Sequence, residues 1–406
     1  MPMRGQNWSV ARPGEALHSL GMSPPIQDAA IRLARGRRLT RVRLATLVIL
    51  ALSGCLNLAG CSDVTYVARA AYEEGRLLWH RRPIRSELAS DDLSPEIRDR
   101  LETVLKVREF ARDKLGLNVG GAYTTVTDVE QGAVVWVVMA APQDSLTPYS
   151  WWFPIVGSVP YRGYFSHEAA EKEASNMEGA GYDTYIRPAV AFSSLGFFDD
   201  PLLSDLLKLN RVELAGVIIH ELFHRTYFLA SDVMFDESAA TYVGNRGAID
   251  YFNTTEGPNS RDTEAARGML ESDFKFAHFL DEQRARLSTV YATNLPQEEL
   301  LKRRKVLFAE ISSDYVRQKR MLSGLERFNL DKTPINNAVL IDYLIYFHDF
   351  DNFATLERMH HGDLRATIHS IIELAKNNPE DPFFAIWQVT HSTHAMTTVS
   401  SPSTSR

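Results

Sequence analysis

The chain has 406 residues, 45% of them hydrophobic, with a net charge of −7 and two cysteines. This length and apolar fraction allow a sizeable buried core and exclude a disordered protein. Residues 1–61 carry a formal charge of +6, which leaves −13 on the remaining residues. A body this acidic repels a phosphate backbone, so we expect no nucleic acid among the partners of this protein.

The basic N-terminal part has the form of an export signal. The stretch RLARGRRLTRVR is followed by an apolar run at residues 44–52, which is shorter than the ~20 residues of a membrane-spanning helix. The run ends in LSGC and LAGC follows, and each resembles the lipobox of bacterial lipoproteins, whose cysteine is acylated after cleavage. We therefore expect residues 1–60 to be an N-terminal extension and a signal peptide that is removed.

The acylated residue would be Cys61, or alternatively Cys55, and its lipid would hold the mature protein at a membrane of the cell envelope. Ser62 stands after Cys61 at the position where an aspartate favours the inner membrane, so we expect the outer membrane and a periplasm-facing domain. The competing interpretation is a membrane-spanning helix that continues to Leu58. Asn57 and the two Gly-Cys pairs interrupt such a helix.

The first predicted element of the mature chain is a helix between residues 91 and 117. Apolar residues recur there with the spacing of one helical face. Ser94 suits the N-cap, Pro95 suits the first helical position, and Gly116 suits the end of the helix.

The next two segments have strand patterns. Residues 122–129 alternate like a half-buried strand, and residues 133–141 are apolar throughout, like a central strand. A helix at about residues 167–179 then leads to a further strand at residues 182–193. This succession predicts an α+β fold with a small β-sheet.

A helix with an HExxH motif follows these strands. Asp200 and Pro201 are expected to begin a short helix, and Asn210 with Glu213 has the capping-box pattern at the start of a longer one. The longer helix contains VIIHELFHRTYFL, so the motif is expected to lie on a helix.

The C-terminal part is predicted to be helical. Two long charged segments, residues 261–292 and 297–323, are separated by Asn-Leu-Pro and predict an antiparallel helical hairpin. A further helix is expected at about residues 362–376. Residues 390–406 are rich in Ser and Thr and predict a disordered tail, which leaves one domain at residues 61–389.

The HELFH motif offers two metal ligands and a base in a fixed relation. Residues four apart lie on one helical face, so His220 and His224 can direct their imidazole nitrogens at one ion. Glu221, about 100° around the helix, can reach a water molecule beside that ion. A catalytic zinc ion takes three protein ligands and water, so a third ligand is needed.

The third ligand is expected to be Glu237, thirteen residues after His224 in MFDESAATYVGNRG. This segment predicts a second helix with Asp236 near its N-terminal cap. A return toward the first helix would place Glu237 opposite the histidines. Asp232, in the predicted connection, and Asp236 remain alternative ligands.

The sequence around these residues resembles known families. HELFH, twelve residues and then the glutamate of FDESAATYVG resemble the gluzincin metallopeptidases, with Asp236 in place of their usual asparagine. The whole mature chain resembles a bacterial family of predicted zinc-dependent aminopeptidase lipoproteins. The matching stretches are residues 61–84, 145–165, 193–203, the HELFH segment, 335–340 and 362–364.

This resemblance implies a predominantly helical, zincin-like metallopeptidase fold with one Zn²⁺ ion, a peptide or protein substrate and a lipid anchor at Cys61. It assigns zinc ligation to His220, His224 and Glu237, and the role of general base to Glu221. The better-known gluzincin aminopeptidases hold the substrate's free amine with a G-x-M-E-N-like strand, and this sequence has no such run. Aminopeptidase specificity is therefore an expectation from the resemblance alone.

The sequence does not select the residue that donates a hydrogen bond to the anionic oxygen of the transition state. The candidates are Tyr161, Arg162, Tyr164, Tyr343 and Tyr346.

Two other function classes also fit the sequence. A catalytically degenerate zinc lipoprotein would act as an envelope chaperone or assembly factor, binding unfolded partners with its long hairpin. In a lipid-anchored structural protein, the HELFH residues would be part of the core. Burying two histidines and a glutamate on an apolar helix is costly without partners, which favours a metal site.

Overall fold

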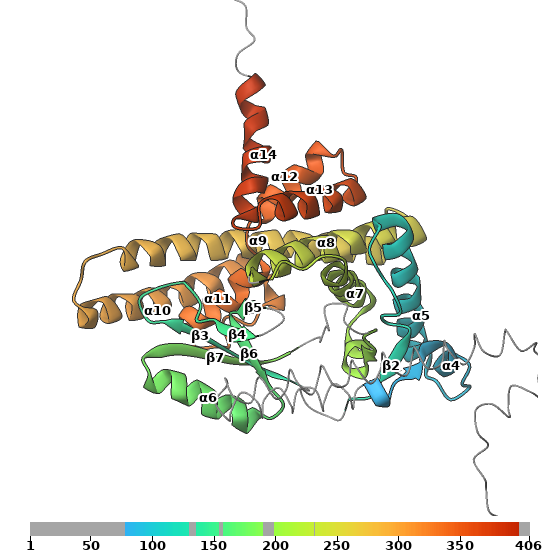
Figure 1. Cartoon of the computed structure of the whole chain (residues 1–406), viewed down its shortest axis with the longest axis horizontal. Helices are drawn as coiled ribbons and strands as arrows, with labels where there is room; N and C mark the ends of the chain where they lie inside the picture. Colours follow the sequence, from blue (N-terminus) through green and yellow to red (C-terminus); the bar gives the residue numbers. More distant parts are fainter. Residues whose placement is uncertain (1–77, 130–134, 154–156, 190–198, 231, 398–406) are drawn as a thin grey trace, which may run out of the picture. The chain divides into compact units, whose positions relative to one another are not determined.

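The computed structural model describes residues 78–129, 135–153, 157–189, 199–230 and 232–397. In this part of the chain, helices predominate and small β-sheets accompany them (Figure 1). The predicted α+β class is therefore confirmed. The predicted signal segment, Cys55 and Cys61 lie outside the described residues.

The N-terminal elements place a small sheet beside a long helix. Helix α5 (Pro95–Phe110) begins as predicted, because the side chain of Ser94 caps its first turn. A π-helical turn (Ala111–Leu115) continues α5, and Gly116 ends it with a φ of 75°. The remaining elements here are β1 (Arg82–Pro83), α4 (Ile84–Leu88), β2 (Thr125–Thr127) and β8 (Leu202–Leu203).

Strand β2 lies between β1, which is antiparallel to it, and β8, which is parallel to it. The prediction of a short helix that begins at Asp200 and Pro201 is wrong at its start. The chain forms strand β8 directly after these two residues. A 3-10 helix (Ser204–Lys208) follows β8. Leu202 pairs with Val126 and is fully buried, so strand pairing outweighs the local helix-start signal.

The central sheet has the order β6-β3-β7, with both pairs antiparallel. Its strands are β3 (Trp136–Pro142), β6 (Tyr161–Tyr164) and β7 (Tyr182–Pro188). A separate hairpin consists of β4 (Trp151–Phe153) and β5 (Gly157–Val159).

Helices cover both faces of this central sheet (Figure 1). Helix α6 (His167–Gly179) packs on the side of Val138, and α11 (Asn337–Tyr346) packs on the side of Val137 and Met139. Alternate side chains of β3 thus enter two different apolar clusters. This explains why β3 is apolar throughout, as predicted for a central strand.

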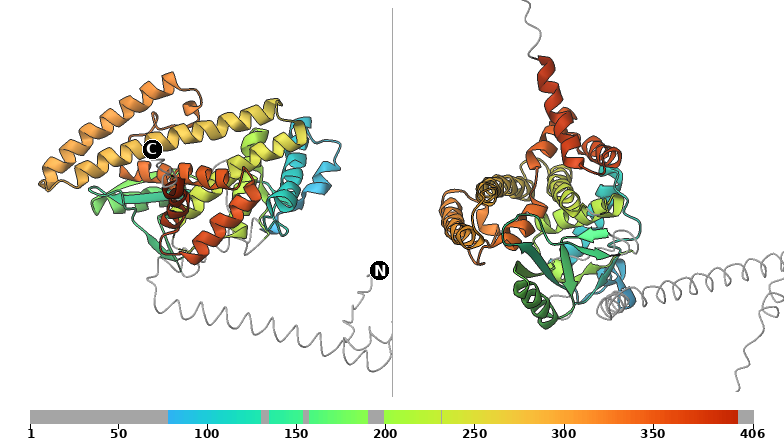
Figure 2. Two further views of the ribbon diagram at one scale, coloured as in Figure 1. Left: turned by 90° about the horizontal axis from the view of Figure 1, so that it is seen from above. Right: turned by 60° about the vertical axis from the view of Figure 1, so that its left-hand side comes forward.

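Four long helices follow. Helices α7 (Arg211–Thr226) and α8 (Val233–Glu256) pack against each other, and α9 (Arg261–Tyr291) packs on α8. Helix α10 (Gln297–Met321) runs back along α9 (Figure 2). Arg286 of α9 reaches two acids of α10, Asp314 at 2.8 Å and Glu310 at 2.6 Å, which hold the two helices together as an antiparallel hairpin.

The C-terminal helices are α12 (Phe350–Met359), α13 (Leu364–Asn377) and α14 (Pro382–Thr397). Residues 390–397, expected to belong to a disordered tail, are helical in α14. Its start is anchored against α12 and α13 by the buried Ile386, and Thr390 is buried and donates a hydrogen bond to the Ile386 carbonyl. Among the described residues, no helix is both long enough and apolar enough to cross a membrane.

Candidate metal centre

Helix α7 starts with the capping box predicted from its sequence. The Asn210 side chain accepts hydrogen bonds from the amides of Val212 and Glu213, and the Glu213 carboxylate accepts one from the Asn210 amide at 3.2 Å. The capping box therefore fixes the first turn of α7, ten residues before His220. The HELFH motif lies in its C-terminal half, among buried apolar residues.

The acid that caps α8 is Asp232, whereas Asp236 was predicted near the cap. Asp232 is the N-cap of α8 and accepts a hydrogen bond from the Phe235 amide at 3.1 Å. Asp236, expected near the cap, lies within the first turn, and its carboxylate accepts from the Leu229 amide at 2.9 and 3.2 Å. Burial raises the pKa of Asp236 to about 8. Neither acid belongs to the cluster of possible metal ligands.

Helices α7 and α8 face each other through two matched stripes of residues. Gly216, His220 and His224 recur every four residues on α7, and Glu237, Thr241 and Gly244 recur at steps of four and three on α8. The helices run antiparallel, so the histidines of α7 meet Thr241 and Glu237 of α8. Because residues three and four apart share one face of a helix, each stripe faces the other helix when the two helices pack closely.

Three side chains converge where these stripes end. The Nε2 atoms of His220 and His224 are 3.0 Å apart, and Glu237 Oε2 lies 3.1 Å from the first and 3.3 Å from the second. Ligand atoms at zinc distances of 2.0–2.1 Å in a tetrahedral arrangement stand about 3.3 Å apart. The spacing and the two-nitrogen, one-oxygen donor set therefore fit a zinc ion.

The charges of the cluster favour binding of a cation. Burial works against the charged form of His224, but the adjacent carboxylate of Glu237 raises the pKa of this imidazole to about 9. In return, the histidines lower the pKa of Glu237, although burial opposes this. The carboxylate thus stays ionised inside the protein, where a metal ion can replace the proton on the imidazole.

Thr241 supports the first histidine from the side opposite the cluster. Its Oγ1 lies 3.4 Å from His220 Nδ1. A hydrogen on Nδ1 that points to this hydroxyl leaves Nε2 free to bind metal. The Nδ1 atom of His224 is buried and has no hydrogen-bond partner among the described residues.

Glu221 is buried beside the cluster with only 9% of its surface exposed. Burial raises the pKa of its carboxyl, while the neighbouring His220 and His224 lower it. Tyr123 lies close enough for the charge of Glu221 to raise the pKa of its phenol, although burial is the larger cause. Tyr123 has a φ of 57°, an uncommon value for a bulky residue, and sequence analysis did not single it out.

Two of the candidate tyrosines lie near the three clustered residues. The ring of Tyr346 stands 6.4 Å from that of His220 at an interplanar angle of 26°. Tyr161 packs in the same apolar cluster as Tyr346, and burial and then the charge of Glu237 raise the pKa of its phenol.

The other candidates lie elsewhere. Tyr164 packs in the cluster under α6, on the opposite face of the sheet from Tyr161, and Arg162 lies over the Tyr164 ring at 5.7 Å. Tyr343 packs on Phe276 of the helical hairpin, with ring centroids 5.1 Å apart. Period-two alternation along β6 accounts for the separation of Tyr161 from Arg162 and Tyr164.

A charged pair that was not predicted from the sequence lies next to Tyr346. Arg187 Nε of β7 lies 2.8 Å from both carboxylate oxygens of Asp342 in α11, and its second terminal nitrogen donates to the Tyr346 hydroxyl at 3.1 Å. The available signal was an arginine inside a strand and an aspartate inside an otherwise apolar helix. Opposite charges in two buried segments indicate a buried pair.

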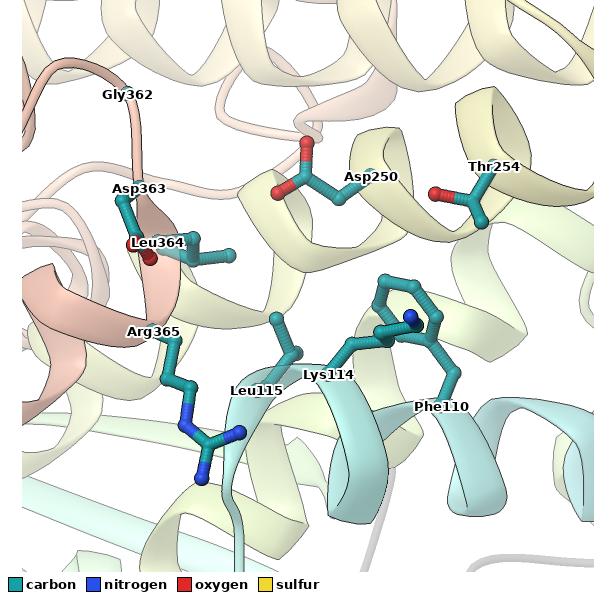
Figure 3. Close-up of a pocket in the computed structure, with 9 residues that line it drawn as sticks. All are labelled: Phe110, Lys114, Leu115, Asp250, Thr254, Gly362, Asp363, Leu364 and Arg365. Carbon is teal, nitrogen blue, oxygen red and sulfur yellow. The ribbon is translucent and has the colours of Figure 1, made fainter.

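Two surface hollows lie away from this cluster. One, of about 260 Å³, lies between the end of α5, α8 and the start of α13, with Lys114, Asp250 and Arg365 in its wall (Figure 3). The other, of about 400 Å³, lies between the start of α7, α9 and the segment after α10. Neither hollow is lined by the three clustered residues.

The fold and the cluster define a protein with a candidate zinc site of two histidines and a glutamate. The chain belongs to the family described as "Putative aminopeptidase", whose model matches residues 65–382. Family membership implies a peptide substrate. No curated protein and no solved structure matches the chain.

Proposed function

We propose that this protein is a zinc-dependent peptidase in which His220, His224 and Glu237 hold the metal and Glu221 is the general base. The observation that carries the proposal is the convergence of the three ligand atoms within 3.0–3.3 Å of one another. Glu221 follows His220 directly on the same helix, which brings a buried carboxyl to the same place.

Each residue has a distinct part in peptide hydrolysis. Zinc bound at the cluster supplies a Lewis acid that acidifies water and polarises a carbonyl group. Glu221 accepts the proton of the attacking water and passes it to the leaving amine. Because burial raises the pKa of Glu221, its carboxyl is a better proton acceptor than a carboxylate in water. A nearby phenol, from Tyr346 or Tyr161, donates to the carbonyl oxygen as it becomes anionic.

The substrate class is a peptide with a free amino terminus, as the family description suggests. The chain lacks the G-x-M-E-N-like run that holds this amine in better-known relatives of the gluzincin type. A different acid must then pair with the amine, or the enzyme cuts internal bonds. Comparing peptides with free and acetylated amino termini separates these two cases.

A cleavage assay on a peptide library tests the proposal. We expect zinc-loaded protein to hydrolyse free-amine peptides and Glu221→Gln to bind zinc normally but lose at least about a hundredfold in rate. An envelope phenotype that the Glu221→Gln variant still complements, without peptide cleavage by the wild type, would instead support a chaperone or assembly role.

We also propose that Cys61 is acylated and anchors the protein at the outer membrane. The support is the basic stretch, the short apolar run and the LAGC sequence before the family match begins at residue 65. Metabolic labelling with a fatty acid tests this in full-length protein. Label should disappear in Cys61→Ala and persist in Cys55→Ala, and the reverse pattern would assign the anchor to Cys55.

A further inference from the structure

Arg187 and Asp342 form a buried ion pair that joins the central sheet to the helix carrying Tyr346. Their side chains are 18% and 6% exposed, and Arg187 Nε is 2.8 Å from each carboxylate oxygen. A buried ion pair is often no more stabilising than apolar side chains of the same volume. Stability alone therefore does not explain why charged residues occupy this place.

The pair makes one further hydrogen bond, and the donor and the acceptor in it are fixed. Arg187 donates a hydrogen bond to the Tyr346 hydroxyl at 3.1 Å. A guanidinium group has donors and no acceptor, so the phenol oxygen must accept. A phenol hydrogen lies in the plane of its ring, at one of two positions. Because the phenol oxygen accepts from Arg187, the hydrogen of Tyr346 is not used in this contact and is available to a different acceptor.

Tyr346 is held at the metal cluster by the same helix that supplies Asp342. The two residues are four apart on α11, so they share a helical face and hold the guanidinium between them. The guanidinium carbon also lies 5.6 Å from the centre of the Tyr346 ring. The same ring lies 6.4 Å from the ring of His220. The phenol that carries the free hydrogen therefore lies near the candidate metal ligands.

We propose that Arg187, held by Asp342, is a positioning residue that directs the Tyr346 hydroxyl hydrogen toward the carbonyl oxygen of the scissile peptide bond. The inference rests on the proposed peptidase function. Tyr346 touches the substrate, and Arg187 acts through Tyr346. No bond is made or broken by either residue, since both contribute hydrogen bonds to a charge that develops in the transition state.

Kinetics of single and double variants test this assignment. Tyr346→Phe should lower kcat about a hundredfold with KM within about twofold, as expected when one transition-state donor is lost. Arg187→Lys, which cannot bridge the carboxylate and the phenol with one rigid fork, should lower kcat at least about tenfold. The double variant should be no slower than Tyr346→Phe alone, because Arg187 works only through the phenol.

The same strand offers a matched control. Arg304 of α10 forms a second buried, two-point pair with Asp183, at 2.7 and 2.9 Å, near the other end of β7. Arg304→Lys should lower the melting temperature but leave kcat within about twofold of wild type. Asp342→Asn, which keeps the volume of the side chain, provides a second test if Arg187→Lys fails to fold.

A binding measurement adds a readout that does not depend on turnover. A phosphinic peptide has tetrahedral, anionic oxygens where the transition state has them. Calorimetry on zinc-loaded protein should show about tenfold weaker binding in both Arg187→Lys and Tyr346→Phe, with about one zinc per chain retained. Wild-type kcat in Arg187→Lys and Asp342→Asn, or losses that multiply in the double variant, would overturn the inference while leaving the peptidase proposal intact. Failure of the zinc-loaded wild type to cut any peptide would sink both.

Discussion

Gly244 of α8 lies directly against His220 of α7. A Cβ atom added at Gly244 would stand 2.6 Å from the Gly216 carbonyl oxygen and 3.1 Å from the Cβ of His220. Only a residue without a side chain allows the two helices to approach this closely. Because Glu237 lies seven residues earlier on the same stripe of α8, this approach sets the distance between the carboxylate and the histidines.

Gly244→Ala should therefore weaken both the fold and the metal site. The added methyl group meets backbone, which cannot turn away, so we expect a loss of about 1–3 kcal/mol in the free energy of unfolding and weaker zinc binding. Gly268→Ala in α9 is the matched control, since an added Cβ there meets no atom within 4 Å. It should be neutral or stabilising by up to about 1 kcal/mol. Denaturant unfolding and zinc titration of both variants check this, and equal effects would contradict it.

Thr241→Val should weaken zinc binding without changing the shape of the packed helices. The substitution removes the hydroxyl that lies 3.4 Å from His220 Nδ1 and so releases the imidazole from its metal-binding orientation. Loss of such a partner costs roughly tenfold in metal affinity. Thr241→Ser keeps the hydroxyl and should bind zinc like the wild type. Competition with a chelating dye measures both, and equal affinity of the valine variant would exclude this role for Thr241.

Asp273 makes the stability of the protein depend on pH. This α9 carboxyl is fully buried, and burial raises its pKa from 3.8 to about 6 despite Arg327 and Asn245 beside it. Between those two pH values the folded state holds a proton that the unfolded state has released. The free energy of unfolding therefore falls as the pH rises from about 4 to about 6, by on the order of 3 kcal/mol.

Asp273→Asn should remove this slope, because its side chain does not titrate and still accepts a hydrogen bond. Chemical unfolding of the wild type and the variant at pH 4, 5 and 6 compares the two slopes. Parallel curves would mean that the carboxyl titrates with its ordinary pKa in the folded protein.

The parts of this structure that were predicted correctly depend on residues that are close together in the sequence. The capping box of α7 and the span of α6 depend on neighbouring residues, and both were predicted from them. The gathering of His220, His224 and Glu237 was also predicted, because a short connection returns the chain to the same helix. Helical periodicity and one tight turn are sufficient to bring these side chains together.

Contacts between distant segments were not predictable in this way. Arg187 and Asp342 are 155 residues apart, and their pairing depends on how α11 packs on the central sheet. Asp236 was expected near the cap of α8, but Asp232 is the N-cap, because either acid can cap the helix and only the path of the backbone selects one. Strand β8 formed where a helix was expected, since its partner β2 lies far away in the sequence.

The zinc content of purified protein tests the central claim most directly. After identical dialysis, metal analysis should find about one zinc per chain in the wild type and in Asp232→Asn, and less than about a tenth in Glu237→Ala. Asparagine caps a helix as well as aspartate does, so Asp232→Asn tests the rival ligand without unfolding α8. Less than about half an equivalent of zinc in the wild type, or full zinc in Glu237→Ala, would contradict a zinc site built from His220, His224 and Glu237.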